Sequence, residues 1–169
     1  MCRLDTATLA LLACLASSAF AQQTAPNPAS KAAQSVLAPA YSKSGLIPLD
    51  MGPNQALKFG IDPTTLSISK DGIVRYVIVA SSNTGATNAM YEGIRCSTGE
   101  FTTYARATTA GSWETVQDPE WRSMYDNMPS KHALALANQG ACSGRATARS
   151  VGAIIQALKP SQQRQQRYY

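Results

Sequence analysis

The chain has 169 residues and a formal net charge of +5, and 15% of its residues are charged. This length suits one ordinary domain. The lysines and arginines form no dense block and no nucleic-acid-binding motif occurs, so the composition argues against a nucleic-acid partner. No apolar run approaches the about 20 residues that a membrane-spanning helix requires, so we expect no transmembrane helix.

Residues 1–21 have the pattern of a secretory signal peptide. Arg3 stands near the start, residues 7–16 are apolar, and residues 19–21 read Ala-Phe-Ala, which suits signal peptidase. We therefore expect cleavage after Ala21 and a periplasmic protein. Residues 11–14, Leu-Leu-Ala-Cys, offer an alternative because they resemble a lipobox, in which Cys14 would be acylated and anchored in the outer membrane.

The remaining chain divides by composition into three parts. Residues 22–45 are rich in Ala, Ser, Pro and Gln, which is typical of a flexible leader. Residues 46–159 carry the alternating and periodic apolar patterns of a single domain. Residues 160–169 form a polar tail with two arginines, which we expect to be disordered.

Removal of the signal peptide would leave two cysteines, Cys96 and Cys142. An even number of cysteines in an oxidising compartment predicts a disulfide between them. A redox-active pair is the alternative, but the chain has no C-x-x-C sequence. The spacing therefore favours a structural bridge.

Several β-strands are predicted in the first half of the domain. Apolar residues alternate in residues 55–61 and again in residues 64–69. Asp71-Gly72 then predicts a tight type I′ hairpin turn. Residues 73–81 are apolar and β-branched enough for a central strand covered on both faces.

The next two strands continue the same antiparallel arrangement. The polar residues 81–85 reverse the chain into the strand that contains residues 91–96, YEGIRC. Residues 101–107 return, and regular alternation would place Phe101, Thr103 and Ala105 on one face and Thr102, Tyr104 and Arg106 on the other. Trp113 begins a short edge strand, so short turns predict a meander of four to six strands.

Two helices are predicted after the strands. Residues 131–138, KHALALAN, form a short helix that Gly140 ends. Residues 147–159 form a second helix whose apolar stripe comprises Val151, Ile154, Ile155 and Leu158. Strands followed by helices predict an α+β fold with both helices packed on one face of the sheet. The disulfide would hold the short helix against that face.

Glu92 is an unusual residue in this pattern, because a regular strand would place it on the apolar face with Met90 and Ile94. Glycine inside a strand often marks a bulge, so Gly93 predicts a bulge at Glu92–Gly93. The bulge would turn the carboxylate toward solvent or an arginine such as Arg75, Arg95 or Arg106. The functional alternative is a partly buried acid with a raised pKa that acts as a general base.

One long segment carries a family resemblance. Residues 62–105, DPTTLSISKDGIVRYVIVASSNTGATNAMYEGIRCSTGEFTTYA, are followed by Trp113, Trp121, His132, Leu134 and Cys142. This run, with DGIVRY and YEGIRC as its most specific parts, resembles the cryptic neisserial protein family of proteobacterial envelope proteins. The resemblance covers about residues 55–142 and implies a secreted or periplasmic protein. It implies no activity and no catalytic residue.

The remaining polar and aromatic residues define two functional readings. Trp113 and Trp121 have acidic neighbours and could form a platform for a glycan or peptide, or they could cover the open end of the sheet. We expect a non-enzymatic module that binds an unknown envelope protein or glycan through these tryptophans, Glu92 and Arg95. The alternative is a small periplasmic hydrolase using Glu92 or His132, although no G-x-S-x-G sequence nominates a serine.

No cofactor or metal is expected from the sequence. His132 is the single histidine, so one chain cannot supply a multi-histidine metal site. No glycine-rich phosphate loop or calcium loop occurs either.

Overall fold

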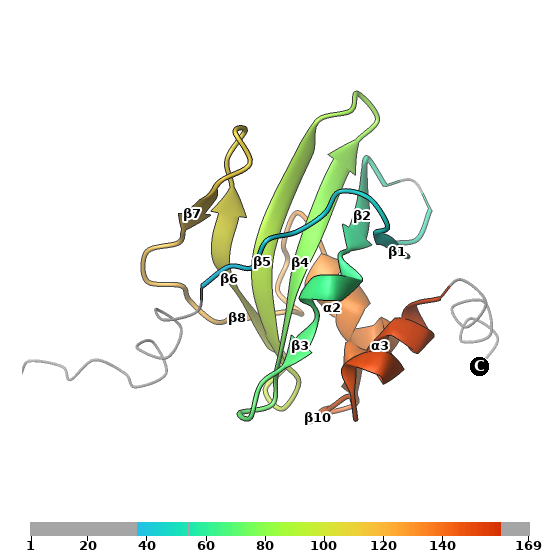
Figure 1. Cartoon of the computed structure of the whole chain (residues 1–169). Coiled ribbons are helices and arrows are strands. Elements are labelled where there is room, and N and C mark those ends of the chain that lie inside the picture. The colour runs from blue at the N-terminus through green and yellow to red at the C-terminus, as the bar shows by residue number, and fades with distance from the viewer. Residues whose placement is uncertain (1–36, 54, 160–169) are drawn as a thin grey trace, which may run out of the picture.

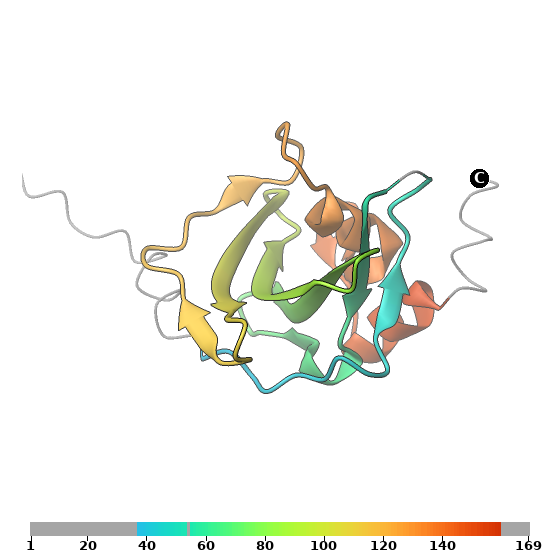
Figure 2. The same ribbon diagram turned by 90° about the horizontal axis from the view of Figure 1, so that it is seen from above.

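The computed structural model describes residues 37–53 and 55–159. These residues form an antiparallel sheet with helices on one face and the N-terminal residues 37–46 across the other (Figures 1 and 2). The predicted signal peptide, the cleavage site after Ala21, the lipobox at Cys14 and the C-terminal tail lie outside the described residues.

The sheet has eight strands in the order β1-β2-β4-β5-β6-β7, with β3 paired to β4 and β8 paired to β6. Its strands are β1 (Ile47–Leu49), β2 (Leu57–Ile61), β3 (Ser67–Ile68), β4 (Ile73–Ser82), β5 (Thr87–Arg95), β6 (Glu100–Ala107), β7 (Trp113–Thr115) and β8 (Arg122–Ser123). The α+β fold and its antiparallel sheet are therefore confirmed. Strand β4 is central and largely buried on both faces, as its continuous apolar run predicts.

The turn between β3 and β4 differs from the predicted type I′ turn. Gly72 has a φ of 77°, but Asp118 is the one described non-glycine residue with positive φ, so Asp71 lacks the required conformation. Gly72 N–H instead donates to the Ser69 carbonyl at 2.9 Å, which closes a longer turn. A short 3₁₀ helix, η1 (Pro63–Thr65), also replaces the start of the predicted strand over residues 64–69.

The C-terminal part forms a compact helical layer. Helix α2 (His132–Leu136) continues into the wider turn η2 (Ala137–Ala141), which ends near Gly140 at a φ of 128°. A Cβ atom on Gly140 would lie 2.5 Å from the Cβ of Ala157, so glycine permits η2 and α3 to pack closely. Strands β9 (Cys142–Ser143) and β10 (Ala146–Thr147) form a small ribbon before helix α3 (Val151–Leu158).

Helix α3 begins later than the predicted residue 147. The ribbon strand β10 occupies Ala146–Thr147, and Ser150 caps the helix by accepting the Ala153 N–H at 3.1 Å. Ile154 and Leu158 of the predicted stripe are fully buried against the sheet layer. The helix therefore presents the expected apolar face, shortened at its N-terminal end.

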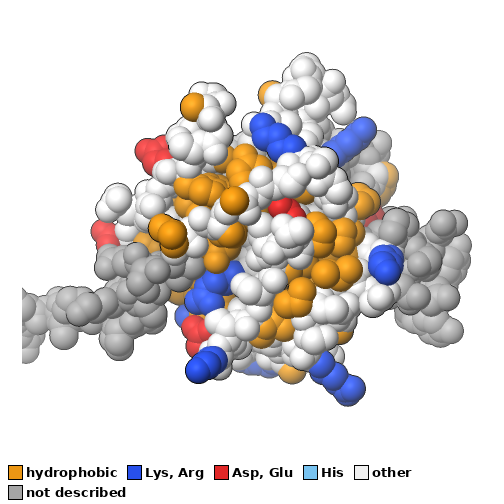
Figure 3. Space-filling model, viewed as in Figure 1, with side chains coloured by type: hydrophobic (Ala, Val, Ile, Leu, Met, Phe, Trp, Pro, Cys, Tyr) orange, Lys and Arg blue, Asp and Glu red, His pale blue; other side chains and the backbone are white. Residues whose placement is uncertain are grey.

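Each face of the sheet has its own core. The helix-side core contains Tyr76, Ile78, Ile94 and Leu136 among its buried members. The second core, on the opposite face, contains six buried residues, Val77, Val79, Ala89, Tyr91, Tyr104 and Ala105. Apolar side chains are visible on the face of the molecule shown in Figure 3.

Residues 37–46 cross the sheet over the second core (Figure 1). Ala38, Tyr41 and Leu46 pack against that core, and the rings of Tyr41 and Trp113 have centroids 5.1 Å apart. The Trp113 Nε1–H donates to the Pro39 carbonyl at 2.8 Å. The end of the segment predicted as a leader thus covers one face of the sheet.

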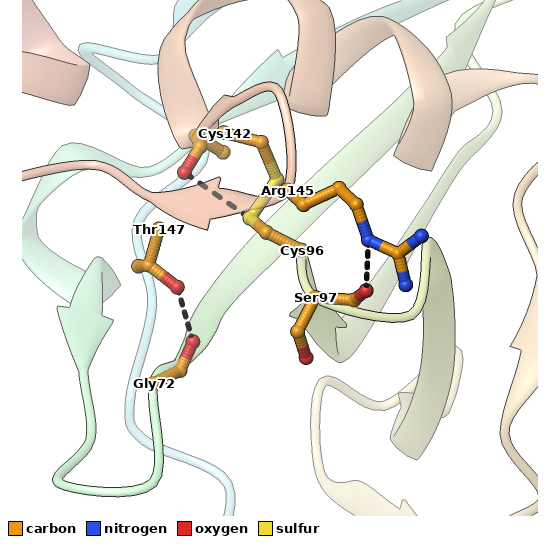
Figure 4. Close-up of a disulfide and its surroundings, with 7 residues drawn as sticks. Gly72, Cys96, Ser97, Cys142, Arg145 and Thr147 are labelled. Atoms are coloured by element: carbon orange, nitrogen blue, oxygen red, sulfur yellow. Dashed lines mark hydrogen bonds between the residues drawn. A yellow bond between two sulfur atoms is a disulfide. The ribbon is translucent and has the colours of Figure 1, made fainter.

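The predicted disulfide joins Cys96 and Cys142, with 5.7 Å between their Cα atoms. It connects the end of β5 to the start of β9 (Figure 4). Nearby, the Thr147 hydroxyl donates to the Gly72 carbonyl at 2.6 Å, and Arg145 Nε donates to the Ser97 carbonyl at 2.9 Å. These contacts fasten the β9–β10 ribbon to the turns at one end of the sheet.

Candidate functional site

The bulge predicted at Glu92–Gly93 is wrong. Strand β5 pairs with β4 in continuous register, with Tyr76 opposite Glu92 and Arg75 opposite Gly93. Glu92 therefore remains on the helix side of the sheet, where it is 1% exposed. Gly93 is required for a different reason, because a Cβ there would lie 2.7 Å from the Tyr104 hydroxyl oxygen.

The irregularity belongs to the neighbouring strand β6. Tyr91 pairs with Ala105, but Glu92 pairs with Thr103, so Tyr104 is the extra residue. Tyr104 and Ala105 both pack into the second core. The predicted alternation of β6 is therefore wrong after Tyr104.

This bulge determines where Arg106 lies. Arg106 pairs with Met90 and lines the same cleft as Glu92, on the helix side of the sheet. Regular alternation would have placed Arg106 on the other face with Tyr104. The bulge thus adds a cation to the surroundings of the buried carboxylate.

Three side chains donate hydrogen bonds to the Glu92 carboxylate. Oε2 accepts from the Tyr76 hydroxyl at 3.0 Å and lies 2.8 Å from His132 Nε2. Oε1 accepts from the Thr103 hydroxyl at 3.1 Å. A buried carboxylate requires such partners, and strands β4, β5 and β6 together with helix α2 provide them.

The partner of Glu92 is a histidine and none of the predicted arginines. Arg75 lies 3.8 Å from the Asp71 carboxylate, and Arg95 lies 3.3 Å from the Glu100 carboxylate. An arginine was expected because a guanidinium is the usual cationic partner of a carboxylate. His132 is 40 positions away, and only the packing of α2 on the sheet brings it to Glu92.

His132 extends the hydrogen-bonded chain to Ser130. The Ser130 hydroxyl oxygen lies 2.9 Å from His132 Nδ1 and 3.4 Å from the His132 backbone nitrogen. The imidazole also stacks on Phe59, with ring centroids 5.3 Å apart, and meets the edge of Phe101 at 5.9 Å. Both ring nitrogens therefore have polar partners, while the ring itself packs against two aromatic residues.

The buried pair shifts the ionisation of its neighbours. Burial opposes the charged imidazolium of His132, but the charge and hydrogen bond of Glu92 outweigh burial, and Arg106 opposes them weakly, so the pKa of His132 is raised. Burial and the nearby Glu92 charge raise the pKa of the Tyr76 hydroxyl well above its usual value. Tyr76 therefore remains a hydrogen-bond donor, and the imidazolium persists to higher pH than in a free histidine.

A cleft of about 570 Å³ opens above this chain of residues. Its volume falls in the range of small-molecule sites. Asp118 lines the cleft with a φ of 48°, which is strained for a residue that precedes a proline. The other lining residues come from β5, β6, the segment between β7 and β8, the start of β8, and residues 128–132, among them Glu92, Arg106, Glu120, Arg122, Ser130 and His132.

The two predicted platform tryptophans lie at different ends of β6. Trp113 pairs with Ala107 in β7, whereas Trp121 immediately precedes Arg122, which pairs with Phe101. Six strand residues separate these positions, or roughly 20 Å. The structure therefore does not join the two tryptophans in one platform.

Both tryptophans have partners within the protein. Trp113 packs on the N-terminal segment, and the Arg95 guanidinium lies 3.9 Å from the ring centroid of Trp121. The partners of Arg95 are therefore Trp121 and Glu100, and no ion pair among the described residues joins it to Glu92. Of the predicted binding residues, Glu92 alone lines the cleft.

Comparison with known proteins identifies a family. The model of the CNP1-like family matches residues 25–159. The chain belongs to this family. No curated protein and no solved structure matches the chain. The family match confirms the resemblance as membership of the CNP1-like family. The family is uncharacterised, so membership assigns no chemistry to the cleft.

Two further features, a metal site and a membrane-spanning helix, do not occur in the part of the chain that the structure describes. No group of three or more His, Cys, Asp or Glu side chains there could hold a metal ion. Among residues 37–53 and 55–159, no helix is long and apolar enough to cross a membrane.

Sequence reasoning missed three residues of this site, Tyr76, Thr103 and Ser130, and it considered Arg106 only as an ionic partner of Glu92. Tyr76 and Thr103 could have been paired with Glu92 from strand register, because each lies opposite it. Ser130 stands two residues before His132, a spacing that allows a serine to contact a histidine at the start of a helix. No local signal indicates the bulge that directs Arg106.

Proposed function

We propose that this protein is an exported cell-envelope protein whose cleft binds a small polar ligand without converting it. The observation that carries the proposal is the Ser130–His132–Glu92 chain within a cleft of about 570 Å³. Concave sites with a few convergent polar groups and shifted pKa values are the usual ligand sites of proteins. A glycan, or a small polar group carried by another envelope protein, would be such a ligand.

Binding is favoured over catalysis because the acidic and basic groups are already engaged. Glu92 accepts hydrogen bonds from Tyr76, Thr103 and His132, and is 1% exposed. A general base must accept a proton from the substrate, and this carboxylate is almost fully buried with both oxygens already hydrogen-bonded. The raised pKa of His132 likewise reduces the fraction of neutral imidazole.

Export to the periplasm is supported by the signal-peptide pattern of residues 1–21 and by the Cys96–Cys142 disulfide. Cell fractionation and N-terminal sequencing test it, with Gln22 expected as the first residue. Labelling with a radioactive fatty acid in the native protein and in Cys14→Ala distinguishes the lipid-anchored alternative. A label that requires Cys14 would replace the periplasmic form with the anchored one.

The binding proposal is tested by screening small polar compounds against the purified protein by NMR. We expect hits that shift the amide signals of cleft residues. Gln117→Trp should fill the cleft and abolish these shifts, because Gln117 is exposed and lines it. Gln156→Trp, on the exposed side of α3, is the matched control and should keep them. Hits that persist in Gln117→Trp would contradict the proposal.

A second candidate, a serine hydrolase, is favoured by one specific observation. Ser130, His132 and Glu92 form a linear chain of the kind that activates a serine nucleophile. Ser130 Oγ would attack an ester carbonyl, its proton would pass to Nδ1 of neutral His132 and then to the leaving alcohol, and water would release the acyl group.

A fluorophosphonate probe tests this candidate directly. It would label Ser130 in the native protein but leave Ser130→Ala unlabelled if the serine is an activated nucleophile. Absence of labelling across the pH range would remove the hydrolase reading and leave the binding proposal intact.

A further inference from the structure

Arg106 lines the cleft and forms no ion pair within the part of the chain that the structure describes. Its side chain is exposed, and its described polar contact is a 3.5 Å approach to the Met90 sulfur, a weak acceptor. Its guanidinium therefore retains donors that an incoming acceptor can use.

Ser130 provides a second donor in the same cleft. When His132 is protonated, both ring nitrogens donate, so Nδ1–H donates to Ser130 Oγ at 2.9 Å. The His132 backbone N–H also points to that oxygen, at 3.4 Å. Ser130 accepts in both contacts, which leaves its own hydroxyl proton available for a ligand.

The charges around the cleft explain why an anion would be favoured at this position. The His132–Glu92 pair is neutral in sum, and Arg106 lies beside it without an ion pair to any described residue, although Asp118, Glu120 and Arg122 also line the cleft. The positive charge of Arg106 opposes protonation of His132 and offsets a small part of the rise in its pKa that Glu92 causes. An anion placed between Arg106 and Ser130 would reduce the repulsion between these two cations.

We propose that the cleft recognises the carboxylate group of its ligand, bound between the Arg106 guanidinium and the Ser130 hydroxyl. Arginine binds carboxylates with two parallel hydrogen bonds, which gives orientation as well as affinity. Asp118 and Glu120 also line the cleft, and their charges disfavour a multiply charged anion such as phosphate. This inference rests on the proposed binding function.

The test compares two probes that differ in one charge, N-acetylalanine and its neutral amide, titrated by NMR at fixed ionic strength. We expect the acid to shift cleft signals with an affinity about tenfold above that of the amide. Inorganic phosphate serves as a third probe and should bind more weakly than the acid.

Three variants locate the site. Arg106→Gln and Ser130→Ala should each reduce the affinity for the acid by about tenfold. Arg149→Gln, an equal change of charge at an exposed position outside the cleft, should leave it unchanged. Thermal melting identifies any variant that fails to fold, and Arg106 is exposed enough that its variant should fold normally.

The outcomes separate this inference from the proposed function. Equal binding of acid and amide, stronger binding of phosphate, or full retention of acid affinity in Arg106→Gln would overturn the carboxylate assignment while leaving a ligand-binding cleft. Equal losses in Arg106→Gln and Arg149→Gln would indicate a general charge effect and would also overturn it. Failure of this acid together with every compound of the wider screen would overturn both proposals.

Discussion

His132 Nε2 lies 2.8 Å from Glu92 Oε2, and the two side chains are only 7% and 1% exposed. Removal of one partner from a buried ion pair leaves the other without compensation, at a cost of about 3–5 kcal/mol. We therefore expect Glu92→Ala to lower the free energy of unfolding by that amount. Glu100→Ala, which removes a partly exposed pair with Arg95, should cost less than about 1 kcal/mol. Urea unfolding measures both values, and similar small losses would contradict the prediction.

The ionisation of His132 can be followed without ambiguity, because it is the single histidine of the chain. Its pKa is raised in the folded protein, with burial and Arg106 opposing the larger effect of Glu92. In Glu92→Gln the opposing effects remain, so the pKa should fall below its ordinary value. An NMR titration of the imidazole protons measures it. Glu100→Gln should leave the pKa unchanged, and an unchanged value in Glu92→Gln would show that Glu92 is not the cause.

The same pair makes stability depend on pH. A folded-state pKa above the unfolded value of about 6.5 means that the stabilisation is fully present below that pH. It is lost as the pH rises through the folded-state pKa. The charged or titratable groups near His132 are Glu92, Tyr76 and Arg106, and Tyr76 titrates far above this window. Thermal melting against pH should show this decline in the native protein and a flatter curve in His132→Gln. Parallel curves would refute the linkage.

The disulfide closes a loop with a sequence separation of 46 residues between Cys96 and Cys142. A loop of this length corresponds to about 4 kcal/mol in the chain-entropy model. Replacement of both cysteines by alanine should reduce the free energy of unfolding by about that amount in a urea titration. Reducing agent should lower the stability of the native protein to a similar level and leave the double variant unaffected. Unchanged stability of the native protein under reduction would contradict the prediction.

Gly93 and Gly152 should respond oppositely to substitution by alanine. A Cβ at position 93 would lie 2.7 Å from the Tyr104 hydroxyl oxygen and 3.0 Å from an Ile73 methyl group, so overpacking should cost roughly 1–3 kcal/mol. Gly152 lies exposed in α3 with 3.8 Å to its nearest atom, so alanine there should stabilise by about 0.5–1 kcal/mol. Urea unfolding compares the two. Tyr104→Phe should partly rescue Gly93→Ala, and no rescue would place the strain elsewhere.

Trp113 holds the segment of residues 37–46 against the sheet through its contacts with Tyr41 and Pro39. Trp113→Ala should therefore expose this segment to trypsin, with cleavage after the exposed Lys43 accelerated on the order of tenfold. Trp121→Ala is the control, because its ring packs on Arg95. Equal acceleration in both variants would indicate global destabilisation.

The sequence by itself determined those features that depend on local pattern or on simple counting. The apolar run of residues 73–81 predicted the central strand, and the stripe at Ile154 and Leu158 predicted the buried face of α3. The even number of cysteines after the predicted signal peptide predicted the Cys96–Cys142 bridge. These predictions succeeded because periodicity and chemical parity are properties of the chain before it folds.

Tertiary structure alone decided the site. Whether Gly93 marks a bulge or a close approach depends on how Tyr104 packs over it from the next strand. That packing moves the bulge to β6 and directs Arg106 to the side of Glu92. His132 becomes the partner of Glu92 because helix α2, which begins 40 positions later in the chain, packs on the sheet. Side-chain alternation is a local rule, whereas a bulge and a buried ion pair are set by the free energy of contacts between distant segments.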